Sequence, residues 1–280
     1  MAVVLALVSA LMYGLSDFLG GLVSRRVSAW SAAVVGQTSS TVCTALAALF
    51  VSGSPTAAHF AWGAVAGLAG GVGTAFLYRG LSGGRMGVVA PVSAVGSAVV
   101  PVVVGALTGE RPGSLMWVGI VLALPAIWLI STVPASAPGE HRESFAAGLT
   151  DGIVAGLGFG AMFAALGQVP DGAGLWPLAT VQAFSVLGVV LLATALRTEW
   201  VPRSPQAAWA ALTGPFGATA ALAFLLATHH GFLTLSGVLA AFYPAVTVLL
   251  AVVVLRERIH RVQALGLAIC AVSVVLVSLA

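Results

Sequence analysis

The chain carries very little charge. It has no lysine, and its 11 basic residues and eight acidic residues make up 7% of its 280 positions. Hydrophobic residues account for 60% of the sequence, and the mean hydropathy is +1.09. A soluble domain needs more surface charge than this, so the composition excludes one. The net charge of +3 does not indicate a nucleic-acid partner, because the arginines stand singly or in pairs at the ends of apolar stretches.

Cysteines and catalytic motifs are equally scarce. The two cysteines, Cys43 and Cys270, lie inside apolar stretches, so no disulfide framework is expected. The sequence contains no glycine-rich phosphate-binding loop of the GxxxxGK[ST] type, no HExxH pair and no Gly-x-Ser-x-Gly elbow. The adjacent His229 and His230 lack a third ligand at metal-binding spacing and are at most a sensor of external pH. We therefore expect neither an enzyme nor a resident cofactor or metal.

Ten apolar stretches fill most of the chain. Each has about 20 residues, the length that a helix rising about 1.5 Å per residue needs to cross roughly 30 Å of hydrocarbon. The sequence thus predicts an all-α polytopic membrane protein with ten transmembrane helices. The stretches are Ala2 to Val23, Trp30 to Val51, Ala61 to Gly80, Met86 to Leu107, Ser114 to Thr132, Phe145 to Leu166, Leu175 to Leu196, Ala207 to Thr228, Leu233 to Leu255 and Val262 to Leu279.

The arginines support this count and orient the chain. If ten helices alternate in direction, ten of the 11 arginines fall on one face and Arg111 alone falls on the other. The positive-inside rule makes the arginine-rich face cytoplasmic and places both termini outside, in the plasma (inner) membrane. The arginines of this face are Arg25, Arg26, Arg79, Arg85, Arg142, Arg197, Arg203, Arg256, Arg258 and Arg261.

The chain repeats itself. A shift of 147 residues superposes Glu110-Arg111 on Glu257-Arg258, and a shift of 145 brings Gln37 onto Gln182. We divide the chain into a first five-helix repeat at 1–135, a connecting loop at 136–144 and a second five-helix repeat at 145–280. Because five is odd, the second repeat enters the membrane from the opposite face. Two inverted repeats are the architecture of many secondary transporters.

The motifs of the two halves carry a family resemblance. The stretches "YGLSDFLGG", "GVVAPVSAVGSAVVPVVVGALTGERPGSLMWVGIVL" and "GVLAAFYPAVTVLLAVVVLRERIHRVQALGLAI" resemble the EamA-type members of the drug/metabolite transporter superfamily over essentially the whole chain. The resemblance implies a carrier that exports an amino acid, metabolite or drug-like compound, and it suggests that Glu110 and Glu257 act as gate or helix-end elements. Ser97 stands where the second half has Pro244, so the fourth and ninth spans are expected to bend at different levels.

Asp17 is the sharpest candidate for a functional residue. It lies eight residues before Arg25, which places it about 12 Å inside the cytoplasmic end of a continuous helix. A carboxylate at that depth requires a partner, a proton or a wet cavity. Asp17 therefore either couples transport to protons or binds a substrate cation, or it forms a structural ion pair with Arg79 or Arg85.

Asp151 is a second intramembrane candidate. It follows Arg142 by nine residues, so it can lie at a depth like that of Asp17 and serve as a second coupling carboxylate. The alternative, which the Thr150-Asp151-Gly152 sequence favours, is that Asp151 caps a helix beginning at Ile153.

Other intramembrane residues divide by their expected tasks. Buried polar groups in lipid need partners and should point inward. We expect Gln37 and Gln182 to bridge helices. Residues expected to line a cavity are Tyr13, Ser16, Tyr78, Ser93 and Tyr243, with Arg79 near its mouth. Prolines expected to kink spans that line the cavity and move are Pro91, Pro101, Pro215 and Pro244. Glycines expected to bring helices into close contact are Gly63, Gly67 and Gly71, and Gly152, Gly156 and Gly160.

Together these features predict a secondary-active transporter that moves a small organic solute by alternating access. Its partners are the solute, the lipid bilayer and, as a candidate coupling ion, the proton, and it acts as a monomer or a homodimer. Two alternatives from other classes are an intramembrane lipid-modifying enzyme and a non-transporting scaffold or sensor.

Overall fold

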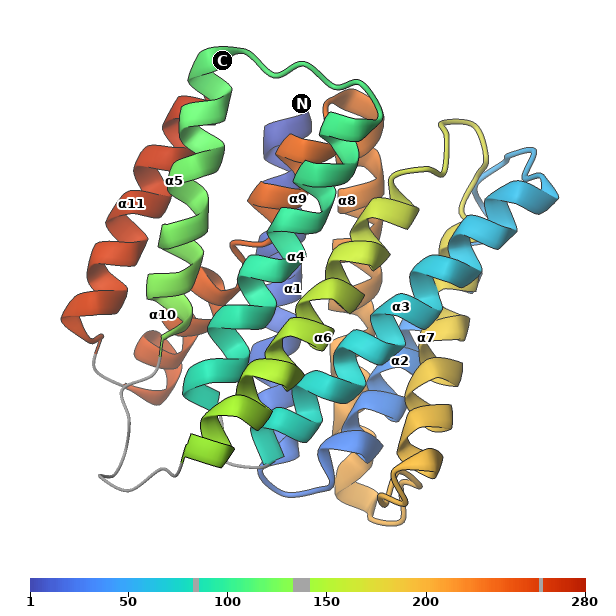
Figure 1. The fold of residues 1–280 in the computed structure, drawn as a ribbon. Helices are drawn as coiled ribbons and strands as arrows, with labels where there is room; N and C mark the ends of the chain where they lie inside the picture. Colours follow the sequence, from blue (N-terminus) through green and yellow to red (C-terminus); the bar gives the residue numbers. More distant parts are fainter. Residues whose placement is uncertain (83–85, 133–141, 257–258) are drawn as a thin grey trace.

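The chain folds into a helical bundle. The computed structural model describes residues 1–82, 86–132, 142–256 and 259–280 (Figure 1). These residues form α1 (Ala2–Ser24), α2 (Ala29–Ala48), α3 (Ala57–Ser82), α4 (Met86–Leu107), α5 (Ser114–Ser131), α6 (Arg142–Leu166), α7 (Trp176–Ala195), the 3-10 helix η1 (Pro205–Leu212), α8 (Thr213–His230), α9 (Leu233–Ala240), α10 (Tyr243–Leu255) and α11 (Arg261–Ser278).

The helices match the ten predicted spans, with α9 and α10 together making the ninth. In the described part of the chain, nine segments are long and apolar enough to cross a membrane. The predicted span that is missing from these nine is the second, α2. It has 20 residues but carries a polar run at Gln37 to Thr41 that lowers its hydropathy. Two hydroxyls of this run are satisfied within the helix: Thr38 donates to the carbonyl of Val34 at 2.7 Å, and Thr41 donates to that of Gln37 at 2.8 Å. Such bonds let a polar helix cross lipid.

The two halves pack into one another. In the first half α3 contacts α6 and α7, and in the second half its equivalent α8 contacts α1 and α2. Likewise α4 contacts α6, while its counterparts α9 and α10 contact α1, and α5 contacts α11. This reciprocal pattern is the one that a pseudo-two-fold axis between inverted repeats produces. Figure 1 shows both termini at the same end of the bundle, as ten crossings require.

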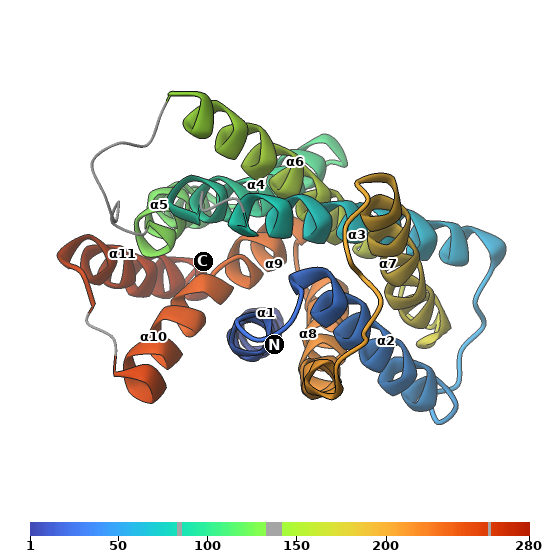
Figure 2. The ribbon, with the colours of Figure 1, turned by 90° about the horizontal axis from the view of Figure 1, so that it is seen from below.

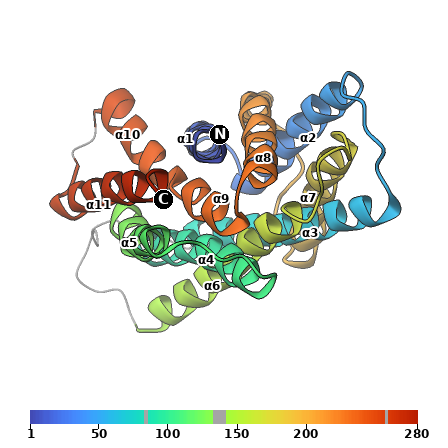
Figure 3. The ribbon, with the colours of Figure 1, turned by 90° about the horizontal axis from the view of Figure 1, so that it is seen from above.

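Seen from either end, the helices form two layers (Figures 2 and 3). One layer contains α10, α1, α8 and α2, and the other contains α5, α4, α6, α3 and α7. The described arginines follow the predicted sorting: Arg25 ends α1 and Arg261 begins α11 at the end opposite the termini, and Arg111 lies between α4 and α5 at the other end.

Glycine stripes hold the closest helix pairs together, as predicted. A Cβ atom placed on Gly71 of α3 would lie 2.9 Å from the Cα atom of Gly188 in α7. A Cβ atom on Gly156 of α6 would lie 2.9 Å from the Cα atom of Gly96 in α4. Because side chains at these positions would force the backbones apart, the glycines set the spacing of α3 with α7 and of α4 with α6.

The four prolines stand in different local structures. Pro244 lies at the break between α9 and α10. In a continuous helix its ring would clash with the carbonyl of Ala240, four positions earlier, and α9 ends at that residue. In contrast, α4 is one continuous helix that contains both Pro91 and Pro101. Pro215 is the third residue of α8, just after the 3-10 helix η1 passes into α8, so it stands close to the change of helix type within the eighth span. The fourth and ninth spans therefore differ, as the exchange of Ser97 for Pro244 indicated.

Candidate functional site: a central cavity with one carboxylate

A cavity of about 130 Å³ lies between the two layers. That volume accommodates roughly ten water molecules, or a solute with about as many non-hydrogen atoms. Helices of both halves build it, namely α1, α2 and α3 with α6, α7, α8 and α10. The described lining residues are Tyr13, Ser16, Asp17, Gly20, Ala32, Ala33, Gly36, Gln37, Ser40, Gly70, Thr74, Leu77, Phe159, Met162, Phe163, Gln182, Ser185, Thr213, Gly217 and Tyr243.

Asp17 is the charged residue among these lining residues. Asp17 is exposed, and it lines the cavity. No residue that the structure describes donates a hydrogen bond to its carboxylate or forms an ion pair with it. The nearest electrostatic partners are the phenol groups of Tyr13 and Tyr243, which share the cavity wall. A carboxylate at this depth without a protein partner is left to water, a proton or a bound cation.

Arg79 and Asp151 form an ion pair with each other outside the cavity wall. The Nε atom of Arg79 in α3 donates to Oδ1 of Asp151 in α6 at 2.9 Å, and Nη2 contacts the same oxygen. The guanidinium also stacks on Phe76, with 4.3 Å between Cζ and the ring centroid. The pairing of Asp17 with Arg79 is therefore wrong, and Arg85 lies outside the described residues.

Asp151 does not begin a helix. Because α6 starts at Arg142, Asp151 lies more than two turns inside it and has a side chain that is 1% exposed. The N-cap interpretation is wrong for this reason. Asp151 is also absent from the described cavity wall, so the structure does not bring it together with Asp17.

The remaining predicted liners divide between the cavity and the core. Tyr13, Ser16 and Tyr243 lie on the cavity wall beside Asp17. Ser93 does not: it is buried in α4, where its hydroxyl donates to the carbonyl of Ala90 at 3.0 Å. The side chain of Tyr78 lies outside the described residues.

The two aligned glutamines line the cavity, although we expected them to bridge helices. No described residue forms a hydrogen bond with the side-chain amide of Gln37 or Gln182, and Gln182 is 7% exposed. Ser40 and Ser185, which the same 145-residue shift superposes, are on the wall as well. The alignment of the two repeats could therefore have identified these cavity residues, because equivalent positions of two inverted halves can meet at the axis that relates the halves.

The equivalent segments of α1 and α6 line the cavity with different side chains. A shift of 146 residues, between the two shifts found elsewhere, pairs Tyr13 with Phe159, Ser16 with Met162 and Asp17 with Phe163. All six residues line the cavity. The first half therefore contributes a phenol, a hydroxyl and a carboxylate where the second half contributes two phenyl rings and a thioether.

Aromatic rings close the cavity toward the end of the bundle that carries the termini. The ring of Tyr13 meets that of Phe163 edge-on at 5.8 Å between centroids, and Phe163 contacts Phe224 at 4.6 Å. Phe163 and Phe224 belong to a buried apolar cluster with Leu166 and Val169 at the end of α6. This cluster separates the cavity from the α6–α7 connection.

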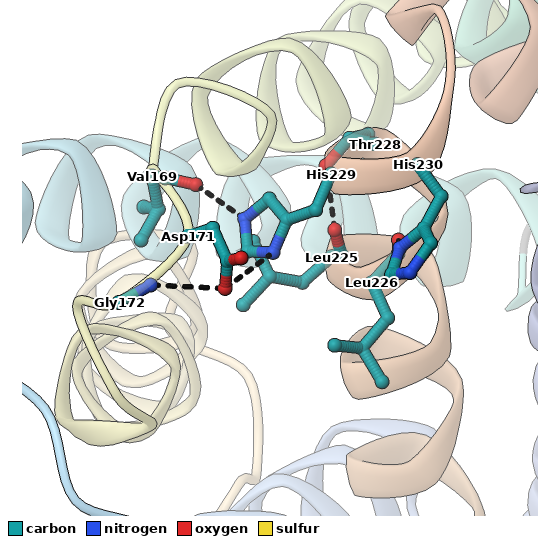
Figure 4. Close-up of polar contacts among 8 residues, drawn as sticks. All are labelled: Val169, Asp171, Gly172, Leu225, Leu226, Thr228, His229 and His230. Atoms are coloured by element: carbon teal, nitrogen blue, oxygen red, sulfur yellow. Dashed lines mark hydrogen bonds and ion pairs between the residues drawn. The ribbon is translucent and has the colours of Figure 1, made fainter.

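A histidine ties α8 to that connection (Figure 4). The Nε2 atom of His229 lies 2.8 Å from the carbonyl oxygen of Val169, and Nδ1 lies 3.7 Å from Oδ1 of Asp171. His230 turns to its own helix, with Nδ1 at 2.9 Å from the carbonyl oxygen of Leu226. The two histidine rings therefore make separate contacts. Within the described ranges, no group of three His, Cys, Asp or Glu residues could hold a metal ion.

Glu110 caps a helix of the other half at the same end. Its carboxylate accepts hydrogen bonds from the backbone N–H groups of Leu233 and Thr234, the latter at 2.9 Å, and from the Thr234 hydroxyl. Gly105 makes room for this contact, since a Cβ atom there would overlap Glu110. The negative charge suits the N-terminus of α9. The equivalent Glu257 lies outside the described residues.

Comparison with known proteins decides the family. Residues 1–132 and 146–279 each match the model of the EamA-like transporter family. The chain belongs to the EamA-like transporter family. It is thus a multi-pass membrane protein of a transporter family within the drug/metabolite transporter superfamily, with two EamA repeats.

Solved structures agree with this assignment at the level of the fold. One crystal structure of a protein with 18% identical residues superposes with a TM-score of 0.76, covering 99% of this chain and 96% of that one. No curated protein matches the chain. The likeness concerns the fold alone, and the function follows from the family and the cavity.

Proposed function

We propose that this EamA-like protein is a secondary transporter that moves a small organic solute by alternating access, with the central cavity as its binding site. The observation that carries the proposal is the Asp17 carboxylate, which no described residue pairs with, in a cavity between two inverted halves. A carboxylate in a lipid-embedded core without a partner is costly to keep unless it has a task.

The position of the cavity supports a direction. Gly20, Ala32 and Leu77 lie within two turns of the helix ends on the arginine-rich side, so the cavity reaches toward that face. The opposite end is closed by the aromatic cluster and by the contact of Glu110 with α9. The positive-inside rule makes the arginine-rich face of the plasma (inner) membrane cytoplasmic and both termini external. In this conformation the cavity receives solute from the cytoplasm, as an exporter requires.

Asp17 supplies a simple coupling scheme. Its carboxylate holds either a proton or the solute, and the loaded carrier exposes the site to the other face. A proton that binds from outside displaces the solute, and the halves return with the proton. Because one carboxylate serves both ligands, proton entry and solute exit are obligatorily exchanged.

Flux measurements in proteoliposomes test this scheme. We expect the wild-type protein to drive solute exchange when a pH gradient is imposed, and Asp17→Asn to abolish the effect of the gradient. Glu199→Gln is the matched control, since Glu199 is an exposed acid beyond α7 and should leave flux unchanged. Unaltered gradient-driven flux in Asp17→Asn would refute the coupling role, and the absence of flux across a broad panel of solutes would refute transport.

A further inference from the structure

We infer that the transported solute is an organic monocation, an amine with one apolar body and no carboxylate or phosphate. The inference rests on the proposed function and names the substrate class of the same cavity. It follows from the charge of the wall, from the placement of its uncommitted polar groups and from the difference between its two sides.

The charge of the wall favours a cation and disfavours an anion. The described lining residues include Asp17 but no arginine, lysine or histidine. Arg79, the arginine expected near the mouth, is engaged by Asp151. A bound ammonium would neutralise Asp17, whereas an anionic group would enter a wall whose described residues include no positive side chain. Burying an unpaired charge is costly.

Helix ends do not replace the missing positive side chain. The N-terminus of α10 reaches the cavity at Tyr243, but Pro244 has no N–H and the N–H of Ala245 donates to the carbonyl of Phe242 at 2.9 Å. The N-terminus of α8 at Thr213 continues from η1, and its N–H is bonded to carbonyls of that helix. The N–H groups of Ala245 and Thr213 are therefore not available to hold a carboxylate.

Uncommitted acceptors share the cavity wall with the carboxylate. The hydroxyl of Ser40 is buried and has no hydrogen-bond partner, and the amides of Gln37 and Gln182 are free of described partners. A Cβ atom on Gly217 would lie 3.5 Å from Oγ of Ser40 and 3.8 Å from Oγ of Ser16, so these oxygens converge on one point of the wall. An ammonium has up to three N–H donors and can satisfy a carboxylate together with such oxygens.

The opposite side of the wall suits an apolar body. Phe159, Met162 and Phe163 of α6 stand at the positions equivalent to Tyr13, Ser16 and Asp17. Rings and a flexible thioether accommodate aromatic or aliphatic groups of varied shape. A solute is therefore oriented with its amine toward α1 and α2 and its apolar part toward α6. The cavity volume suits a solute of about ten non-hydrogen atoms.

A series of four compounds that share a phenyl ring and a two-carbon chain tests the charge rule. Phenethylamine is a cation, phenylalanine a zwitterion, 3-phenylpropionate an anion and 2-phenylethanol neutral. Binding is measured by calorimetry on the purified wild-type protein in detergent, and exchange by counterflow in proteoliposomes. We expect phenethylamine to bind at least tenfold more tightly than each of the others and to exchange.

Two variants locate the amine. Asp17→Asn should remove the preference for phenethylamine over 2-phenylethanol, while Glu199→Gln should keep it. Gly217→Val should weaken phenethylamine binding about tenfold by filling the space beside Ser16 and Ser40, with the thermal midpoint showing whether the variant folds.

Each outcome separates the two proposals. If phenylalanine or 3-phenylpropionate binds as tightly as phenethylamine, or if phenethylamine does not bind, the monocation inference is wrong and the transporter proposal stands on its flux test. If phenethylamine binds with the expected preference but no solute crosses the membrane, transport is wrong while the binding site stands. Retention of the preference in Asp17→Asn would overturn the assignment of the amine to that carboxylate.

Discussion

Breaking the Arg79–Asp151 pair should cost far more from one side than from the other. Arg79→Gln leaves the carboxylate of Asp151, which is 1% exposed, without its cation in the core. Removing one partner of a buried pair typically costs about 3–5 kcal/mol, because the remaining charge is uncompensated. Asp151→Asn leaves Arg79 without this carboxylate instead. The side chain of Arg79 is 38% exposed and lies near the end of α3. Arginine can extend its charged group to the interface, so we expect a loss of about 1 kcal/mol.

The assay is reversible unfolding in mixed detergent micelles, followed by tryptophan fluorescence. The difference of about 2 kcal/mol or more between the single variants corresponds to roughly a 30-fold change in the unfolding constant. The double variant Arg79→Gln/Asp151→Asn should recover part of the loss of Arg79→Gln, since two neutral amides replace a buried carboxylate that has lost the Arg79 guanidinium. Equal losses in the two single variants, or no recovery in the double variant, would show that burial of Asp151 does not determine the energetics of this pair.

Three further substitutions test other parts of the fold. Glu110→Gln should destabilise the protein by about 1 kcal/mol and speed hydrogen exchange in the first turn of α9, because the N-terminal N–H groups lose a charged acceptor; unchanged exchange would contradict the cap. Gly156→Val should cost about 1–3 kcal/mol in the same unfolding assay, because the Cα atom of Gly96 already occupies the space, whereas Gly21→Ala, with no atom within 4 Å, should be tolerated. Pro244→Ala should leave the fold intact but lower flux at least tenfold, because a restored N–H lets α9 and α10 join; wild-type flux would refute a role for the break.

The sequence predicted the architecture well because lipid restricts a chain to few solutions. A spanning segment must be helical and about 20 residues long, so the apolar runs located the helices almost directly. The arginines and the paired Glu-Arg motifs then supplied topology and the repeat. The break at Pro244 was harder to anticipate, because Pro91 and Pro101 are equally interior and leave α4 continuous. What distinguishes them is the packing around each proline, which the sequence does not reveal.

The site was predicted only where a residue had few alternatives. Asp17 attracted attention because a carboxylate in lipid must be explained. Gln37 and Gln182 did not, since an amide can bridge two helices or face a cavity equally well. The partner of Arg79 lies 72 residues away in the other half, a separation at which sequence spacing says nothing about contact. For Asp151, the local preference of Thr-Asp-Gly for a helix start was overridden, because α6 begins nine residues earlier.

The interleaving of the halves has a consequence for biogenesis. Helix α1 is translated first, yet its main neighbours α8, α9 and α10 begin at Thr213 or later, some 189 residues after α1 ends at Ser24. At typical elongation rates of about 5–20 residues per second, the newborn helix waits roughly ten to forty seconds for them. During that interval α1, with Asp17, lacks the helices that surround it in the finished fold. Quality control that recognises stranded intramembrane charges thus has a natural window in which to act on this protein.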